Sequence, residues 1–356
     1  MPTVLPIEQF LAAPGILLDV RSPAEYDYAH IPGAISFPLF SNAERAQVGT
    51  CYKRQGRDAA VELGLQLVGP KLADFVRQAK RLTNAQGGDR VVRVHCWRGG
   101  MRSGSMAWLL ETAGFQVTVL EQGYKGFRQW VRATLAVPKV VVTLGGLTGS
   151  GKTAVLRALA TQGEQTLDLE GFANHRGSSY GALGLPPQPT TEHFENLIAW
   201  QWATLDAVRP VWIEAESRMV GTCRVPDEVF HPMQRAMVLQ MERSRPERIA
   251  ILLAEYGTAN QDDLIQATER IARRLGGQHA KIAIEHIQKH QLSEAIAIVL
   301  DYYDKTYWYD LKKRKVALHS VDVSHCSATA AAQVLRQRLG EILAPAPLNF
   351  ATTTTP

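Results

Sequence analysis

The sequence predicts an α/β protein of two domains. Short β-branched or apolar runs alternate with longer amphipathic stretches, which is typical of strands and helices packed in layers. At 356 residues the chain is long enough for two domains, each with its own hydrophobic core. Hydrophobic residues make up 46% and charged residues 21%, and this composition excludes a largely disordered chain.

Membrane and cysteine-rich classes are excluded on similar grounds. No apolar run reaches the roughly 18 residues that a membrane-spanning helix needs. The four cysteines form no C-x-x-C pair, which argues against a zinc cluster and a disulfide framework. We therefore expect a cytoplasmic protein without a membrane partner.

The individual elements follow from local residue patterns. Four runs rich in β-branched or aliphatic residues are expected to be strands: 15–20, 90–95, 117–120 and 140–144. Four stretches with apolar residues at helical spacing are expected to be helices: 72–82, 103–112, 154–159 and 330–343. From Ser244 to its end the chain is predicted to be mostly helical.

A domain boundary is predicted near residue 136. The segment Leu135–Pro138 contains a proline, which is typical of a linker, and a strongly apolar strand begins straight after it. We therefore expect a first domain at 1–135 and a second at 136–350, the second with a mostly helical C-terminal region.

A cysteine follows the predicted strand 90–95, in the segment Cys96-Trp-Arg-Gly-Gly-Met-Arg-Ser103. The N–H groups of the glycine-rich turn, the following helix N-terminus, Arg98 and Arg102 all place positive charge near the sulfur. Together they should lower the pKa of the Cys96 thiol and bind an anion on or beside it. Two glycines and two arginines within six residues argue against a merely structural cysteine.

Two segments before Cys96 add to this signal: Leu18–Tyr26 (LDVRSPAEY) and His30–Ala34 (HIPGA). Together with Cys96 they resemble the rhodanese superfamily, in which the cysteine at this place forms a persulfide. Common sulfurtransferase rhodaneses have four residues between the cysteine and the loop-closing arginine, whereas Cys96 and Arg102 are separated by five. The longer spacing resembles the rhodanese-fold phosphatases and arsenate reductases, and implies a loop wide enough for a phosphate-like group.

The second domain opens with a phosphate-binding loop. Residues 146–153 (GLTGSGKT) fit the pattern G-x4-G-K-[ST], directly after a predicted strand and before a predicted helix. Backbone N–H groups of such a loop wrap a diphosphate, Lys152 supplies positive charge, and the Thr153 hydroxyl is placed to bind Mg²⁺. The expected diphosphate-binding residues are Gly146, Gly149, Ser150, Gly151, Lys152 and Thr153. The motif indicates a diphosphate but no particular nucleotide, because the loop does not contact a base.

Partner carboxylates are expected at the ends of neighbouring strands. Two segments supply them, residues 166–170 (TLDLE) and 211–218 (VWIEAESR), and a polar loop after the first carries a histidine and an arginine. These side chains are candidates for binding Mg²⁺, diphosphate or tRNA, but capping a helix or forming an ion pair would explain them equally well. The candidates are Asp168, Glu170, His175, Arg176, Glu214, Glu216 and Arg218.

Positive charge is concentrated in residues 70–133, which contain 11 basic and 4 acidic side chains. Such a block can bind a polyanion by releasing its counterions, or can simply be a solvated basic face. A second segment, 301–309, has four tyrosines and a tryptophan and is followed by Lys-Lys-Arg-Lys. Its aromatic rings could stack on nucleic-acid bases, although their helical spacing favours a core face.

A rhodanese-like domain followed directly by a P-loop domain resembles the bacterial tRNA 2-selenouridine synthase family. Further segments carry the resemblance across the chain: 167–178, 213–218, 274–278 (RLGGQ) and 302–307 (YYDKTY). The resemblance implies a P-loop NTPase-like α/β fold for the second domain. It also implies action on the wobble uridine of tRNAs for Lys, Glu and Gln, in which selenium from selenophosphate replaces the sulfur of 5-methylaminomethyl-2-thiouridine. An S-geranylated intermediate, made from geranyl diphosphate, lies on the way.

These implied substrates fit the two loops. The P-loop, with Mg²⁺, would hold geranyl diphosphate and stabilise the leaving diphosphate without hydrolysing a nucleotide. Cys96, Arg98 and Arg102 would form the loop that handles selenophosphate, and no tightly bound cofactor is expected. The basic block and the late aromatic segment are candidate tRNA surfaces.

Two other classes of enzyme stay open on the sequence. One is a P-loop kinase or NTPase with a regulatory rhodanese domain, which would hydrolyse ATP or GTP without tRNA. The other is a cysteine-dependent phosphatase or arsenate reductase that uses Cys96 and Arg102, with the P-loop domain as a binding module.

Overall fold

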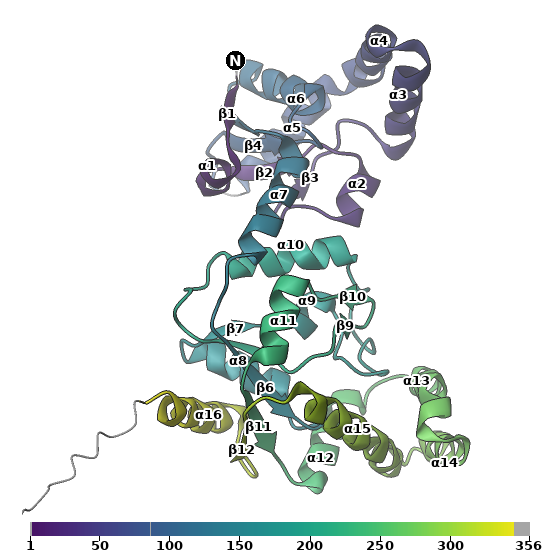
Figure 1. Cartoon of the computed structure of the whole chain (residues 1–356). Helices are drawn as coiled ribbons and strands as arrows, with labels where there is room; N and C mark the ends of the chain where they lie inside the picture. The colour runs from purple at the N-terminus through teal and green to yellow at the C-terminus, as the bar shows by residue number, and fades with distance from the viewer. Residues whose placement is uncertain (1, 86, 345–356) are drawn as a thin grey trace, which may run out of the picture. The chain divides into compact units, whose positions relative to one another are not determined.

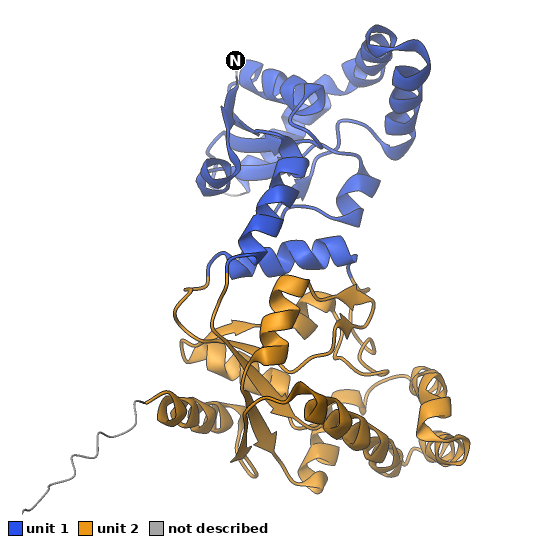
Figure 2. Ribbon diagram, in the orientation of Figure 1, with its two compact units in different colours: residues 1–137, 189–204 blue, residues 138–188, 205–356 orange. Residues whose placement is uncertain are grey.

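The computed structural model describes residues 2–85 and 87–344, and the chain forms two compact units (Figure 1 and Figure 2). The first takes residues up to 137 together with 189–204, and the second takes 138–188 and the residues from 205 onward. The predicted domain end at 350 lies outside the described residues. None of the described helices is both long and apolar enough to cross a membrane.

The first unit is built on a parallel five-stranded sheet in the order β1-β5-β4-β2-β3. Its strands are β1 (Thr3–Leu5), β2 (Ile16–Asp19), β3 (Ile35–Ser36), β4 (Val91–His95) and β5 (Gln116–Leu120). Its helices are α1 (Ile7–Ala12), α2 (Pro23–Tyr28), α3 (Asn42–Gln55), α4 (Arg57–Val68), α5 (Leu72–Asn84), α6 (Met101–Thr112), α7 (Gly123–Leu135) and α10 (Thr191–Trp202), with a short 3₁₀ helix at Gly69–Lys71.

The second unit is built on another parallel sheet, in the order β12-β11-β6-β8-β7. Its strands are β6 (Val141–Gly146), β7 (Gln165–Leu167), β8 (Val211–Glu214), β11 (Val238–Glu242) and β12 (Leu318–Asp322), and a separate antiparallel pair comprises β9 (Met219–Val220) and β10 (Cys223–Arg224). Its helices are α8 (Lys152–Thr161), α9 (Leu169–Ala173), α11 (Asp227–Arg235), α12 (Arg245–Tyr256), α13 (Gln261–Leu275), α14 (Gly277–Gln288), α15 (Leu292–Arg314) and α16 (Ala328–Leu343).

These elements confirm the predicted fold class. The central strands are covered on both faces, so they consist of nearly continuous apolar runs, and the sequence pattern finds them at β2, β4, β5 and β6. The predicted helices are present as α5, α6, α8 and α16, and the chain after Ser244 is mostly helical. Within the region after Ser244, the exception is the strand β12. It lies at the edge of the sheet and has only one buried residue, Val321, so its sequence carries a weak strand signal.

Two features follow from longer-range packing. Helix α10 lies beyond the P-loop in the sequence, yet it packs against α7 of the first unit and buries Phe194, Ile198 and Trp202 there. In both sheets, the carboxyl end of an inner strand leads into a glycine-rich turn and then a helix: β4 into α6, and β6 into α8. This edge is where open parallel sheets bind ligands.

Candidate functional site

Cys96 follows β4 and lies inside its own turn, with only 3% of its surface exposed. The Cys96 Sγ lies 3.2 Å from the Ser103 Oγ. Burial alone would raise the pKa of the Cys96 thiol. Hydrogen bonds from the Ser103 hydroxyl and from the N–H groups of Arg98 and Ser103, with the charge of Arg102, instead hold that pKa below its usual value. The turn therefore favours a thiolate surrounded by donors, as an anion site requires.

The two arginines of this turn contribute differently. The Arg102 Nη1 donates to the Glu25 Oε2 at 2.7 Å, and the same carboxylate caps α2 by accepting from the Ser22 N–H at 2.9 Å. Arg102 is thus fixed beside the loop by an ion pair. The Arg98 side chain is exposed, and the backbone N–H of this residue is the group that faces the sulfur.

The N-terminus of α7 holds the Cys96 loop through backbone hydrogen bonds. The Tyr124 N–H donates to the Cys96 carbonyl at 2.8 Å, and the Lys125 N–H donates to the Trp97 carbonyl at 3.0 Å. Gly123 has a φ of +55°, and a Cβ there would lie 2.4 Å from the Cys96 carbonyl oxygen. Only glycine lets helix and loop approach so closely. Sequence reasoning did not single out Gly123. The available signal was a glycine directly before an aromatic residue, Tyr124, at the start of an amphipathic stretch.

We expect Gly123→Ala to displace the Cys96 loop, because the new methyl group would overlap the Cys96 carbonyl. Thiol titration by alkylation at varied pH should show the Cys96 pKa moving up toward that of an ordinary cysteine. Gly104→Ala on α6 is the matched control, since a Cβ there meets nothing within 4 Å. An unchanged titration in Gly123→Ala would contradict the supporting role.

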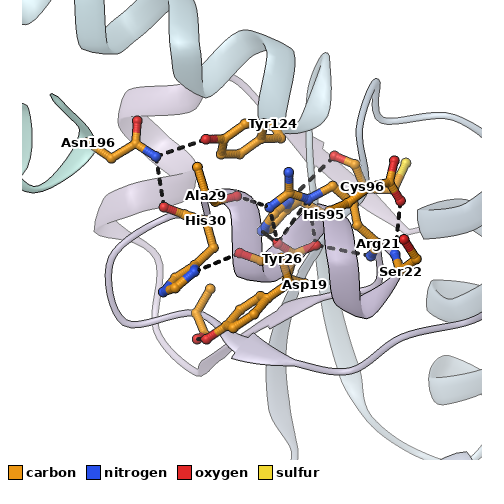
Figure 3. A network of polar contacts seen from close by, with 12 residues as sticks. Asp19, Arg21, Ser22, Tyr26, Ala29, His30, His95, Cys96, Tyr124 and Asn196 are labelled. Carbon is orange, nitrogen blue, oxygen red and sulfur yellow. Dashed lines mark hydrogen bonds and ion pairs between the residues drawn. The ribbon is translucent and has the colours of Figure 1, made fainter. Parts of the chain in front are cut away.

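A buried polar network lies beside the same loop (Figure 3). Asp19, at the end of β2, accepts from the Arg21 Nε at 3.0 Å and from its Nη2 at 2.5 Å, and Arg21 also donates to the Ala29 carbonyl at 2.7 Å. The Arg21 guanidinium stacks 3.9 Å from the centre of the Tyr124 ring. The Asp19 Oδ2 lies 3.6 Å from the Nε2 of His95, the residue directly before Cys96.

This network ties the ends of β2 and β4 to α2. Burial lowers the pKa of His95, so its ring is neutral near pH 7. Burial would raise the pKa of Asp19, but the hydrogen bonds and charge of Arg21 help to hold it below its usual value. Removing one partner of a buried ion pair costs about 3–5 kcal/mol, because the other charge is left unpaired. Helix α10 adds Asn196, which donates to the His30 carbonyl and the Tyr124 hydroxyl, both at 2.9 Å (Figure 3).

In the second unit, the P-loop joins β6 to α8. The Lys152 Nζ donates to the Gly146 carbonyl at 3.1 Å, which places the lysine across the loop. The Ser150 Oγ is buried and has no hydrogen-bond partner among the described residues. Gly151, with a φ of +82°, turns the chain into the helix. The loop lines a cleft of about 620 Å³, a volume suited to a small-molecule anion.

Three predicted carboxylates meet at this loop. One oxygen each of Glu170, Glu214 and Glu216 lies within 4.8 Å of the others, and the Thr153 hydroxyl donates to the Glu170 Oε2 at 2.9 Å. Burial and the neighbouring carboxylates raise the pKa of Glu170 to about 9 and that of Glu214 to about 7. For Lys152, burial would lower the pKa, but the neighbouring Glu214, Glu216 and Glu170 side chains raise it. Near neutral pH the Glu170 carboxyl is therefore protonated and the Glu214 carboxyl only partly ionised, and a cation in the cluster would favour the ionised form of both.

This donor set fits Mg²⁺. Its groups are carboxylate and hydroxyl oxygens, which are the ligands that Mg²⁺ prefers. The Glu214 Oε1 is buried without a hydrogen-bond partner in the described part of the chain, as expected of an atom meant for a cation.

Comparisons with known proteins identify the family of the chain. Residues 6–129 match the model of the rhodanese-like domain, and residues 139–339 match that of the tRNA 2-selenouridine synthase AAA domain. Curated proteins named tRNA 2-selenouridine synthase are similar over most of the chain. The protein from Pseudomonas syringae is 35% identical over 82% of this chain and 87% of its own length, and that from Shewanella oneidensis is 32% identical over 88% and 91%. The chain belongs to the tRNA 2-selenouridine synthase family.

In this member of the tRNA 2-selenouridine synthase family, the other predicted site residues lie outside the carboxylate cluster. Asp168 caps α9 by accepting from the Gly171 N–H at 2.7 Å, and Arg218 pairs with Asp227. Both therefore have structural partners. The His175 Nδ1 accepts from the Gly177 N–H at 3.1 Å, and burial lowers the pKa of that ring.

Arg176 lies in the wall of the P-loop cleft, where it pairs with Glu255 at 2.5 Å and donates to the Leu183 carbonyl at 2.8 Å. Of Arg176 and Arg218, the two arginines predicted for this site, Arg176 is therefore the one that lines the P-loop cleft. Its guanidinium lies 5.7 Å from the centre of the Tyr256 ring.

Helix α15 supports the P-loop through residues that sequence reasoning did not assign. The Tyr307 hydroxyl accepts from the Gly146 N–H at 2.9 Å and donates to Gln240, and Arg314 donates to the Glu216 carbonyl at 3.2 Å. Tyr307 lies in the segment 301–309, where helical spacing favoured a core face, and Arg314 lies in the basic run that follows it. Trp308 and Tyr309 are 38% and 63% exposed and stay available to a partner.

Proposed function

We propose that this chain replaces the sulfur of a wobble 2-thiouridine in tRNAs for Lys, Glu and Gln by selenium. It would act as a selenotransferase with tRNA geranyltransferase activity, using geranyl diphosphate and selenophosphate. The observation that carries the proposal is the pairing of two different anion sites in one family member. One is a P-loop beside three carboxylates, and the other is a cysteine turn with thiolate-stabilising donors.

In the first step, the P-loop N–H groups and Lys152 hold the diphosphate of geranyl diphosphate. The sulfur of the base forms a bond to C1 of the geranyl chain, the C1–O bond breaks, and the diphosphate leaves with the bonding electrons while N3 of the base loses its proton. Thr153, Glu170, Glu214 and Glu216 would hold Mg²⁺, which supplies charge to stabilise the leaving group.

In the second step, selenium displaces geranylthiolate from C2 of the base. Selenophosphate carries selenium at the oxidation level of selenide, so the exchange needs no oxidant. We assign Cys96 the attack on phosphorus: an S–P bond forms, the Se–P bond breaks, and selenide leaves toward the base. Water then cleaves the S–P bond to give phosphate, and N3 regains a proton. Arg102 and the N–H groups around Cys96 would hold the phosphoryl oxygens.

The experiment that tests the whole proposal is mass spectrometry of wobble nucleosides. Thiolated tRNA treated with protein and geranyl diphosphate should yield S-geranylated nucleoside, and adding selenophosphate should convert it to 2-selenouridine. Robust ATP or GTP hydrolysis without tRNA would favour the kinase or NTPase alternative instead. Turnover of a generic phosphoester or of arsenate would favour the phosphatase or reductase alternative.

The tRNA surface is expected on the basic block 70–133. Arg77 and Arg81 lie one turn apart on α5, and both are exposed. Replacing both by Glu should weaken tRNA binding by about tenfold or more and flatten its salt dependence, because each lost phosphate contact removes about 0.9 from the slope. Filter binding at several salt concentrations measures both quantities.

The matched control is Lys53→Glu/Arg57→Glu, which reverses the charge of two exposed residues of the same unit outside the block. The control should bind tRNA like the wild type. If Arg77→Glu/Arg81→Glu keeps the wild-type affinity and salt slope, this face of α5 does not contact tRNA.

A further inference from the structure

An apolar cavity of about 50 Å³ lies among α12, α13, α14 and α15 of the second unit. This exceeds the roughly 10–15 Å³ that one water needs. Its walls are mainly aliphatic, including Leu252, Leu264, Ile287, Ile296, Val299 and Leu300. Such side chains can change rotamer to admit a longer apolar chain, whereas a water in this cavity would find few partners.

Two tyrosine hydroxyls at the cavity wall already have partners within the protein. The Tyr180 hydroxyl bonds to the Thr268 Oγ1 at 2.8 Å, and the Tyr303 hydroxyl accepts from the Ser179 N–H at 3.0 Å. A polar ligand group would lose its hydration here and would find few hydrogen-bond partners in a mainly aliphatic wall. A hydrocarbon has no hydrogen bonds to water that it could lose on entry, and the removal of its apolar surface from water is favourable. The cavity therefore selects for an apolar chain.

The cavity borders the P-loop directly. Thr148, a residue of the loop, and Leu252 of α12 line both the apolar cavity and the cleft that contains Lys152. The Arg248 Nε donates to the Thr148 carbonyl at 2.9 Å and so fixes α12 to the loop. A Cβ on Gly149 would lie 2.9 Å from the Leu252 Cδ1, so loop and helix are in close contact. A ligand with its phosphates on the loop thus has an apolar compartment within reach.

We propose that this cavity binds the hydrocarbon chain of a prenyl diphosphate whose diphosphate lies on the P-loop. The inference rests on the proposed function, which supplies a ten-carbon chain. In a prenyl diphosphate, the chain is joined to the phosphate through C1, so the apolar site and the phosphate site must share a wall, as they do at Thr148 and Leu252. The cavity would also set the preferred chain length.

The test measures binding of an unreactive geranyl thiolodiphosphate and of inorganic diphosphate to the full chain by calorimetry. Val299→Phe fills the cavity from α15, and Ile296→Phe, at a half-buried position, is a second and milder variant. Ile298→Phe is the matched control, because Ile298 is half-buried on the same helix but does not line the cavity. The readout is the ratio of the two affinities, which does not depend on the fraction of folded protein.

We expect the wild type to bind the geranyl analogue more tightly than inorganic diphosphate. Val299→Phe and Ile296→Phe should reduce this preference by about tenfold, since excluding two methylene groups removes about that much hydrophobic gain. Both should also favour a five-carbon dimethylallyl analogue over the geranyl one, and Ile298→Phe should change neither quantity.

Two results would overturn the inference, and they are distinguishable. If the cavity-filling variants bind the geranyl analogue with the wild-type preference, the chain lies elsewhere, although the proposed function stands. If the wild type shows no preference for the geranyl analogue and binds ATP or GTP instead, the proposed function fails together with the inference.

Discussion

Lys152→Ala is expected to abolish geranylation of 2-thiouridine-containing tRNA while the first unit stays folded. The Lys152 Nζ donates to the Gly146 carbonyl at 3.1 Å, and the neighbouring Glu214, Glu216 and Glu170 raise the pKa of Lys152, so it keeps its positive charge at the P-loop. Without it, the diphosphate loses a positive charge in a buried site, both when it binds and when it leaves. Loss of one such electrostatic group costs roughly a hundredfold to a thousandfold in rate. Mass spectrometry of S-geranylated nucleosides measures the effect.

A second variant separates charge from packing. Lys152→Met keeps most of the aliphatic stem and should lose geranylation as fully as Lys152→Ala. Limited proteolysis and circular dichroism should show both units intact in both variants. If either variant geranylates tRNA normally but loses ATP turnover, the P-loop serves a nucleotide, and the chain is better described as a kinase or NTPase.

The P-loop could be predicted from the sequence because every part of it is local. A buried apolar strand, glycines that turn the chain, and the Lys152–Thr153 pair at the helix start lie within thirteen residues, 141–153. The same holds for the Cys96 turn, which follows β4 directly. In both places local backbone geometry creates the site, so adjacent residues carry the full signal.

The carboxylates show where local reasoning ends. Asp168 and Glu170 both follow β7, yet only Glu170 points into the cluster, while Asp168 caps α9. Which acid meets Glu214 depends on the pairing of β7 with β8, and strand pairing is a property of the whole sheet. The sequence supplied the set of acids, and packing selected among them.

Helix α10 and the apolar cavity depend on longer-range packing still. Helix α10 is amphipathic, with Phe194, Ile198 and Trp202 on its apolar face. Its own sequence does not indicate which hydrophobic core this face joins. The cavity arises where four helices leave a gap, and no single one of them carries a signal for it. Likewise, Arg21 belongs to a recognisable motif, but its burial against Asp19 and Tyr124 appears only in the folded unit.

Cys96→Ser is expected to block selenation and spare geranylation. A serine hydroxyl is nearly isosteric with the thiol but does not ionise near neutral pH, so it cannot attack phosphorus as a thiolate does. The wild-type turn lowers the pKa of Cys96, and that advantage disappears with the sulfur. Selenation should fall by about a thousandfold or more, as for loss of a covalent nucleophile. S-geranylated tRNA should accumulate and should be a substrate for wild-type protein given selenophosphate.

Arg102→Ala tests the same site without removing the nucleophile. The ion pair with Glu25 fixes Arg102 beside the loop. Removing the Arg102 side chain should therefore raise the selenophosphate concentration needed for selenation more than it affects geranylation. The two steps then respond to different residues, which is what two separate sites require. Equal loss of both steps in Cys96→Ser, with the fold intact by circular dichroism, would mean a shared active site. Full selenation by Cys96→Ser would make Cys96 a structural residue, because a reaction that proceeds without the thiolate does not use it.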